Sequence, residues 1–418
     1  MKHFAFILGI ILLASVQSLL ALPRYALLTG ARCASCHVNP TGGQMRNDYG
    51  ITYSQNAVPL RSTDVASPKT VSDSTSDTAE STSGSDEFMF NPRINDYISI
   101  GGDYRGQFIY DLGSNPRTTA FQSMTATFYT SIQIGKKINL YYKQDFLNPG
   151  YGNPHIYDLG GPEIYSIVKV IPSTFIKGGA FLPDYGWKVD DHTQYTRGGD
   201  LGYTSAGVNG GLIFTPNYKD VGMEVGWWSG GLSITAGLYN GEGVSQQISF
   251  SYLKAYSVKA EYMGSASGVN YRFGSSGYRN KDFLMGGFHA GVGIGDCVVF
   301  GEIDWTRNRW NPFDGTLPEV IYGLHSMATF AELDYRAVQG VWGILRYEMF
   351  DPLSGTPNDP NYVRPSIFVN GKNSISRLVV GAEIFPYSFV EIRPQYRFDM
   401  ETPSISNDVA LVQFHYWF

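Results

Sequence analysis

Charged residues are scarce in this chain, and neither sign dominates. Only 16% of its 418 residues are Asp, Glu, Lys or Arg, whereas a soluble globular domain usually carries about 25%. The formal net charge is −6 and the isoelectric point is near 5.7, which excludes the basic surface of a nucleic-acid-binding protein. Three cysteines are too few for a disulfide scaffold.

Long apolar segments are also nearly absent. The mean hydropathy is −0.16, and only the N-terminus approaches the roughly 20 apolar residues that one membrane-spanning helix requires. A polytopic helical membrane protein is therefore excluded. Glycine and tyrosine are abundant instead, with 48 and 29 copies, and the apolar residues are spread in alternation. This composition favours a large β-rich protein.

The N-terminal apolar segment is typical of a secretory signal. Lys2 and His3 precede the apolar run Phe4–Leu13, and a small residue follows at Ala21. We therefore predict a signal peptide over residues 1–21, with an uncleaved anchor as the alternative. No cysteine ends the apolar run, which argues against a lipoprotein.

An alternation of apolar and polar residues recurs from about residue 90 to the end, for example over Ile98–Tyr110 and Val221–Trp227. Strands of roughly 10 residues with one apolar face suit a transmembrane barrel, and lipid forces such a sheet to close. At about 20 residues per strand and connection, the segment 88–418 predicts an all-β fold, a barrel of roughly 16 antiparallel strands with 14 to 18 allowed.

The last segment, Ala410–Phe418, alternates in the same way and ends in an aromatic residue. It resembles the closing strand of bacterial outer-membrane barrels, so we predict an outer-membrane location in contact with lipid. A large soluble β-protein is the alternative. The pattern also places Met124 on the apolar face and marks Gly274–Gly277 as a turn.

The alternation of side chains along each strand places many charged residues on the inward face. They predict a solvated lumen wall with a slight preference for cations: Asp103, Glu224, Glu261, Glu302, Asp304, Glu332, Asp334, Arg105, Lys259 and Arg346.

The chemistry lies ahead of the barrel, in Cys33-Ala34-Ser35-Cys36-His37. Cys-x-x-Cys-His is the attachment motif for c-type haem. Two thiols on one helical turn reach the two vinyl groups, and the adjacent histidine presents its ring to the iron. We predict one haem c, covalently held by Cys33 and Cys36, with His37 as the proximal ligand.

Other interpretations of the cysteine pair stay open. The pair alone forms a disulfide or redox dithiol in some proteins, but no βαβ pattern surrounds it. A zinc site would need a second pair, and Cys297 stands alone on a barrel strand, on the apolar face.

The sixth iron ligand is not fixed by the motif. Met45 is a candidate, because its thioether follows a turn-forming Asn39–Gly43 stretch, and packing against the porphyrin is its alternative role. The other histidines are rival ligands or ordinary polar residues: His155, His192, His289 and His415. Arg46 is a candidate partner for a haem propionate.

Residues 62–87 have the composition of a disordered linker. Ser, Thr and acidic residues dominate, and aromatic residues are absent before Phe88. Residues 22–61, the predicted monohaem segment, are too few to form an independent core. Packing inside the barrel is therefore favoured, with a periplasmic position as the alternative.

One haem motif ahead of one barrel resembles the fused monohaem cytochrome–porin family of the bacterial outer membrane, which includes iron oxidases. The matching residues are Tyr25-Ala26 to Thr29-Gly30, Cys33–His37 and the barrel ending at Phe418. The resemblance implies electron passage between an extracellular donor, with Fe(II) a candidate, and periplasmic cytochromes. The Asn39–Gly43 stretch departs from the iron-oxidising members, so the donor and the direction of flow stay open.

Two further functions are kept as alternatives. The first is a passive porin for ions or small solutes, in which the haem segment is a plug or sensor. The second is a hydrolase built on His192 beside Asp190 and Asp191, for which the sequence offers no assignable serine.

Overall fold

The computed structural model describes residues 23–60, 92–113, 116–146, 162–188, 191, 193–197, 218–241, 254–311, 319–321, 325–351, 375–400 and 406–418. The predicted signal peptide, the predicted linker, His155 and His192 lie outside these residues.

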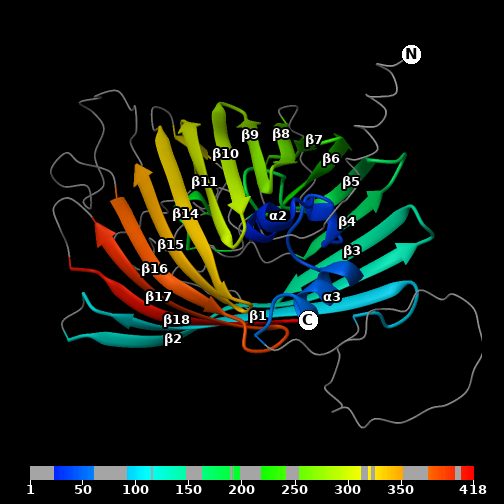
Figure 1. Cartoon of the computed structure of the whole chain (residues 1–418). Coiled ribbons are helices and arrows are strands. Elements are labelled where there is room, and N and C mark those ends of the chain that lie inside the picture. Colours follow the sequence, from blue (N-terminus) through cyan, green and yellow to red (C-terminus); the bar gives the residue numbers. More distant parts are fainter. Residues whose placement is uncertain are drawn as a thin grey trace, which may run out of the picture.

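Sixteen antiparallel strands form a closed barrel (Figure 1), which confirms the predicted fold class. Each strand pairs with its neighbour in the chain, and β1 closes on β18, where Asp103 faces Trp417 and Asp111 faces Val409. The strands of the barrel are β1 (Ile98–Asp111), β2 (Thr118–Ile134), β3 (Ile138–Asp145), β4 (Glu163–Val168), β5 (Thr174–Phe181), β6 (Asp220–Ser229), β7 (Leu232–Tyr239), β8 (Ala255–Ala266), β9 (Val269–Asn280), β10 (Phe283–Ile294), β11 (Cys297–Arg307), β14 (Ser326–Val338), β15 (Val341–Asp351), β16 (Ile375–Ile384), β17 (Val390–Met400) and β18 (Val409–Trp417).

The remaining elements are short. Strands β12 (Arg309–Asn311) and β13 (Glu319–Ile321) pair as a separate two-stranded sheet. Helices α2 (Pro23–Thr29), η1 (Cys33–Ser35) and α3 (Asp48–Asn56) precede the barrel, and η3 (Tyr195–Arg197) lies between β5 and β6. No helix among the described residues is long and apolar enough to cross a bilayer.

The two faces of the strands follow the period-2 pattern. Apolar side chains such as Ile134, Val225 and Trp227 are exposed on the outside, and Cys297 lies on this face, paired with Ile294. An apolar outer belt on a closed sheet is the structure that lipid demands. The chain is an outer-membrane β-barrel protein.

Nine of the ten charged residues that the alternation turned inward are buried, and the tenth, Asp103, is half-buried. Basic side chains pair with many of the acidic ones, from neighbouring strands, from α2 or from the segment between β5 and β6. Lys177 Nζ lies 2.7 Å from Glu224 Oε1, and Arg346 lies 3.3 Å from Glu332. The slight excess of acidic groups predicted from the sequence is thus offset by buried lysine and arginine, and the wall is not a surface of one sign.

Two local predictions are wrong. A β-bulge between Arg105 and Gly106 inserts Met124 as an extra residue of β2, so Met124 is buried rather than on the lipid face. Gly274–Gly277 is not a turn but runs inside β9. The His289 ring packs directly against Gly274, where a Cβ would lie 2.7 Å from the ring. A larger residue would therefore not fit at this position.

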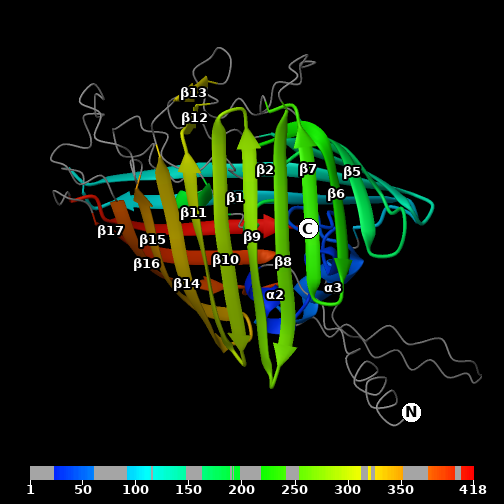
Figure 2. The same cartoon turned by 90° about the horizontal axis from the view of Figure 1, so that it is seen from above.

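The two ends of the barrel differ. At one end the strands are joined by short turns, such as 230–231, 267–268 and 295–296, and at the other end by long connections, such as 182–219 and 352–374. Short turns mark the periplasmic end of such barrels. Figure 2 shows α2 and α3 toward the end where β8 and β9 meet, which is the short-turn end.

Candidate functional site

The segment 23–60, which carries the Cys-x-x-Cys-His motif, lies in the periplasmic mouth of the barrel. Asn270 at the start of β9 donates to the Leu28 carbonyl at 2.8 Å. Gln339, in the β14–β15 turn, donates to the Pro59 carbonyl at 2.9 Å, and Leu60 N donates to Phe385 O at 2.8 Å. These contacts come from separate parts of the circumference, so the segment is held on several sides.

Buried contacts fix α2 against the wall. Tyr25 packs edge-to-face on Trp342, with ring centroids 5.9 Å apart. The neighbouring Arg24 is 4% exposed, and its guanidinium pairs with Asp334 at 3.3 Å and with Glu383. A buried arginine is stable only with such partners, so the charge pattern of β14 and β16 determines where α2 sits.

The motif forms one helical turn. The amides of Cys36 and His37 both donate to the Cys33 carbonyl, at 3.2 and 3.1 Å. Both cysteines are free thiols, which is the state that thioether formation needs. Among the described residues, no group of three or more His, Cys, Asp and Glu side chains is arranged to hold a metal ion.

Two glycines allow the surrounding chain to pack on the motif. A Cβ at Gly50 would lie 2.3 Å from the Cys36 carbonyl oxygen, and one at Gly42 would lie 2.9 Å from Cys33 Cβ. Gly42 also has φ +91°, which favours glycine. Asn47 then caps α3 by accepting from Gly50 N at 3.0 Å, so α3 is locked onto the motif.

His37 lines two cavities. The inner cavity, about 150 Å³, faces the lumen and is also lined by Cys36, Arg46, Lys188 and His415. The outer cavity, about 730 Å³, opens toward the periplasmic turns and is also lined by Ala34 and Arg46. Arg46 therefore borders both spaces, with its guanidinium 5.0 Å from the Trp417 ring.

Met45 and the lumen histidines lie in different surroundings. Met45 is 4% exposed and packs in an aromatic cluster with Tyr129 and Tyr141; it lines neither cavity that His37 lines. Both roles expected of Met45, as iron ligand and as packing residue against the porphyrin, stay predictions. His289 and His415 both point inward, as parity predicted. Both His415 ring nitrogens face carboxylates.

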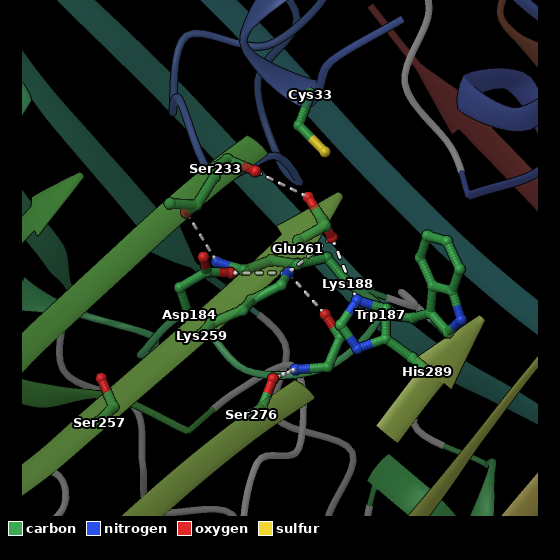
Figure 3. Close-up of polar contacts among 12 residues, drawn as sticks. Cys33, Asp184, Trp187, Lys188, Ser233, Ser257, Lys259, Glu261, Ser276 and His289 are labelled. Atoms are coloured by element: carbon green, nitrogen blue, oxygen red, sulfur yellow. Dashed lines mark hydrogen bonds and ion pairs between the residues drawn. The ribbon is translucent and has the colours of Figure 1, made fainter. Parts of the chain in front are cut away.

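A polar network lies beside the first cysteine (Figure 3). The Arg272 guanidinium lies 3.5 Å from Cys33 Sγ and 2.6 Å from Glu261. Glu261 Oε2 also lies 3.1 Å from His289 Nε2 and 3.6 Å from Lys259 Nζ. The network joins the motif to strands β8, β9 and β10.

The described residues 182–188, 191 and 193–197, between β5 and β6, fold into the lumen. We call these residues the inward loop. Trp187 N donates to Glu302 Oε2 at 2.8 Å, and Arg197 Nη2 lies 2.8 Å from Glu302 Oε1. Tyr185 OH donates to Asp304 at 2.9 Å. Sequence reasoning missed this loop, although inward carboxylates at Glu302 and Asp304 signalled that something in the lumen had to neutralise them.

The fold can now be compared with known structures. OprB of Pseudomonas putida, at high pH, matches with a TM-score of 0.52 and 10% identity over 77% of this chain and 94% of its own. OmpF of Salmonella typhi, in complex with daunomycin, matches with a TM-score of 0.50 and 13% identity over 77% and 97%. The barrel has the porin fold. No protein-family model and no curated protein matches the sequence.

The lumen of this porin-like barrel is largely filled. One aromatic cluster extends along the inner wall, with Tyr141 stacked on Tyr165 at 4.8 Å and Phe181 5.8 Å from Tyr239. The inward loop meets the motif segment directly, since Lys188 Nζ donates to Thr41 Oγ1 at 3.1 Å. Burial lowers the pKa of Lys188.

The burial of Cys36 leads to a testable prediction for the haem-free protein. Burial raises the pKa of the Cys36 thiol to about 12, and the thiolate is the reactive form. Iodoacetamide labelling of Cys36 is therefore expected to be negligible at pH 8 and to rise about tenfold per pH unit toward pH 11. Peptide mass spectrometry measures it, with Cys36 in the urea-unfolded chain as the control. Full labelling of the folded protein at pH 8 would contradict the buried position.

Proposed function

We propose that this protein transfers electrons across the outer membrane through one c-type haem, attached at Cys33 and Cys36 and ligated by His37. In this proposal residues 22–61 form the monohaem segment and residues 62–87 a linker. The position of Cys33–His37 in the mouth of the barrel carries the proposal, because His37 there borders both a cavity that faces the lumen and one that opens to the periplasm.

The residues around the motif fit a haem. Both thiols are unbridged, and their turn brings the histidine beside them. Cationic groups line the cavities next to His37, among them Arg46 and Lys188, and they suit the two propionates. The thiol, imidazole and guanidinium groups are the set that a haem c site requires.

When bound, a c-type haem supplies a one-electron carrier that cycles between Fe(II) and Fe(III). The protein supplies the rest. Gly42 and Gly50 let the chain close on the motif, Arg24 and Tyr25 anchor it to the wall, and the inward loop covers its lumenal side. The residues that fill the lumen separate the site from the far end of the barrel and hold it at one place relative to the membrane.

The proposed partners are an extracellular electron donor or acceptor, with Fe(II) as a candidate, and periplasmic cytochromes. Both follow from the family resemblance. The mouth that holds the motif is the periplasmic one, which favours a soluble carrier on that side.

The decisive experiment is the reduced-minus-oxidised spectrum of protein purified from outer membranes of a host that matures c-type cytochromes. We expect a c-type band that survives denaturation. His37→Ala should abolish electron uptake from the membrane surface, whereas the control His325→Gln should keep it, because His325 lies just before β14, at the end of the barrel opposite the motif. Both variants should show the heat-modifiable migration of a folded barrel. Unchanged uptake in His37→Ala, or no covalent band, would refute the proposal.

A passive porin is the second candidate function. The likeness to OprB and OmpF favours it, because their fold is shared over most of this chain. In this alternative the motif segment is a plug. An open-porin conductance without a haem band would favour it over electron transfer.

A further inference from the structure

Lysines gather on one side of the periplasmic rim. Lys136 and Lys137 form the β2–β3 turn, and Lys169 begins the β4–β5 turn. We call these three residues the basic patch. The two turns are in contact, since Lys169 N donates to the Lys137 carbonyl at 2.8 Å.

The charges of the basic patch are exposed and are not neutralised within the described part of the chain. All three lysines are solvent-exposed, and no described carboxylate lies within ion-pair distance of them. Two acidic residues, Asp48 and Asp96, line the same outer cavity as the lysines. Asp48 is paired with Arg93 at 2.5 Å, so the negative charge of Asp96 alone remains to balance three lysine ammonium groups. Three like charges on touching turns repel one another, so an anionic partner would be favoured here.

The position of the basic patch relative to the motif is the second observation. Its three lysines line the outer cavity of about 730 Å³, and His37 and Ala34 line the same cavity. A molecule docked on the patch would therefore cover the opening that leads to the histidine of the motif.

Among the short turns of the rim, lysines occur only on this side, whereas Arg336 on another side is paired with Asp296. The other short turns, at 230–231, 267–268, 295–296, 339–340 and 385–389, contain no Lys or Arg. A ring of lysines around the whole rim would suit anchoring to anionic lipid headgroups, which surround the barrel on every side. A patch on one side, next to the motif, suits a soluble partner that must approach in one orientation.

We propose that the basic patch docks an acidic soluble redox protein in the periplasm, over the cavity that leads to His37. This deepens the proposed function, on which the redox nature of the partner rests. Charge complementarity of this kind steers encounter and sets orientation more than it adds affinity. The contact is therefore expected to be fast, weak and sensitive to salt.

The test measures binding of two probe proteins to the full-length protein in detergent by biolayer interferometry. Plastocyanin is the acidic probe and mitochondrial cytochrome c the basic one. Plastocyanin should bind at low ionic strength and lose most of its binding at about 1 M salt, where the screening length falls to about 3 Å. Lys136→Glu/Lys137→Glu/Lys169→Glu should slow its association at least about tenfold.

A matched control reverses three charges at the opposite end of the barrel. Arg279→Glu/Lys281→Glu/Arg307→Glu changes the net charge by the same amount, at the ends of β9 and β11 and the turn after β9. Its plastocyanin binding should equal that of the wild type. Equal loss in both variants, or wild-type binding in the patch variant, would overturn the proposal. The proposal would also be overturned if the patch variant lost binding to anionic phospholipid vesicles but still bound plastocyanin, because the patch would then be a lipid anchor.

A second experiment tests electron transfer to the partner separately from docking. The rate at which plastocyanin oxidises the dithionite-reduced protein is followed by stopped-flow absorbance. A patch variant with a normal c-type band but slower oxidation supports both halves. Patch-dependent binding without any haem band would refute the proposed function and the redox role, and would leave only a docking surface for an acidic protein.

Discussion

Glu302→Ala is expected to open the lumen. Glu302 holds the inward loop at two points, through Trp187 N and the Arg197 guanidinium. Its removal leaves a buried arginine with Asp304 as its nearest carboxylate, at 3.8 Å. Breaking a buried pair in this way typically costs about 3–5 kcal/mol, enough to release a loop from the wall. Planar-bilayer recordings should then show a conductance well above that of the wild type, which we expect to be nearly closed.

The isosteric Glu302→Gln variant is the control for this prediction. Its amide oxygen still accepts from Trp187 N but no longer neutralises Arg197, so the conductance should lie between those of the wild type and of Glu302→Ala. Heat-modifiable migration checks that each barrel is folded. A wild-type conductance equal to that of an open porin would contradict the filled lumen and favour the passive-porin alternative.

Lys177→Met is expected to cause a large loss of stability in the barrel wall. Lys177 and Glu224 have fully buried side chains, 2.7 Å apart. The methionine fills the space of the lysine stem but leaves the Glu224 carboxylate without its cation. Tyr239 OH and Asp184 N still donate to Glu224, at 3.1 and 3.2 Å, but they do not neutralise it. We expect a loss of about 3–5 kcal/mol in the free energy of unfolding.

A double substitution tests the cause. Lys177→Met/Glu224→Gln removes both charges and keeps an acceptor for Tyr239, so it should recover most of the lost stability. Guanidinium unfolding followed by tryptophan fluorescence measures each variant. If the double variant is as unstable as Lys177→Met, the loss comes instead from the contact of the Lys177 ammonium with the Phe181 ring, 4.2 Å from its centroid.

The barrel wall was predictable because its signal is local. A strand shows alternate residues to lipid and lumen, so the parity of Asp103 or Glu302 follows from their nearest neighbours. The bulge at Met124 shifts the alternation of β2 by one residue. The sequence does not reveal this shift, because apolar and small residues stand on both sides of Met124. Gly274–Gly277 resembled a turn because glycine and serine are frequent in turns, whereas here their small size makes room for His289 and for the inward loop.

The candidate site was only partly predictable. Cys33, Cys36 and His37 carry a motif with fixed spacing, and their shared turn follows from it. The inward loop has no such pattern: Trp187 and Arg197 are positioned by Glu302, a residue on a strand more than 100 positions away. The same holds for Arg24, whose partners Asp334 and Glu383 are separated from it by 310 and 359 residues. Contacts of this kind depend on the closed barrel and leave no local trace.

The long separation between Arg24 and its partners has a consequence for the order of assembly. Its carboxylates come from β14 and β16, and Trp417 of β18 belongs to the same buried cluster as Tyr25. The segment that is synthesised first can therefore reach its final position only after the last strands have paired. Contacts between such distant residues form late, because a long loop must close before any of them contributes. A barrel that fails to close has no place for this segment, so its burial from protease marks each molecule whose assembly is complete.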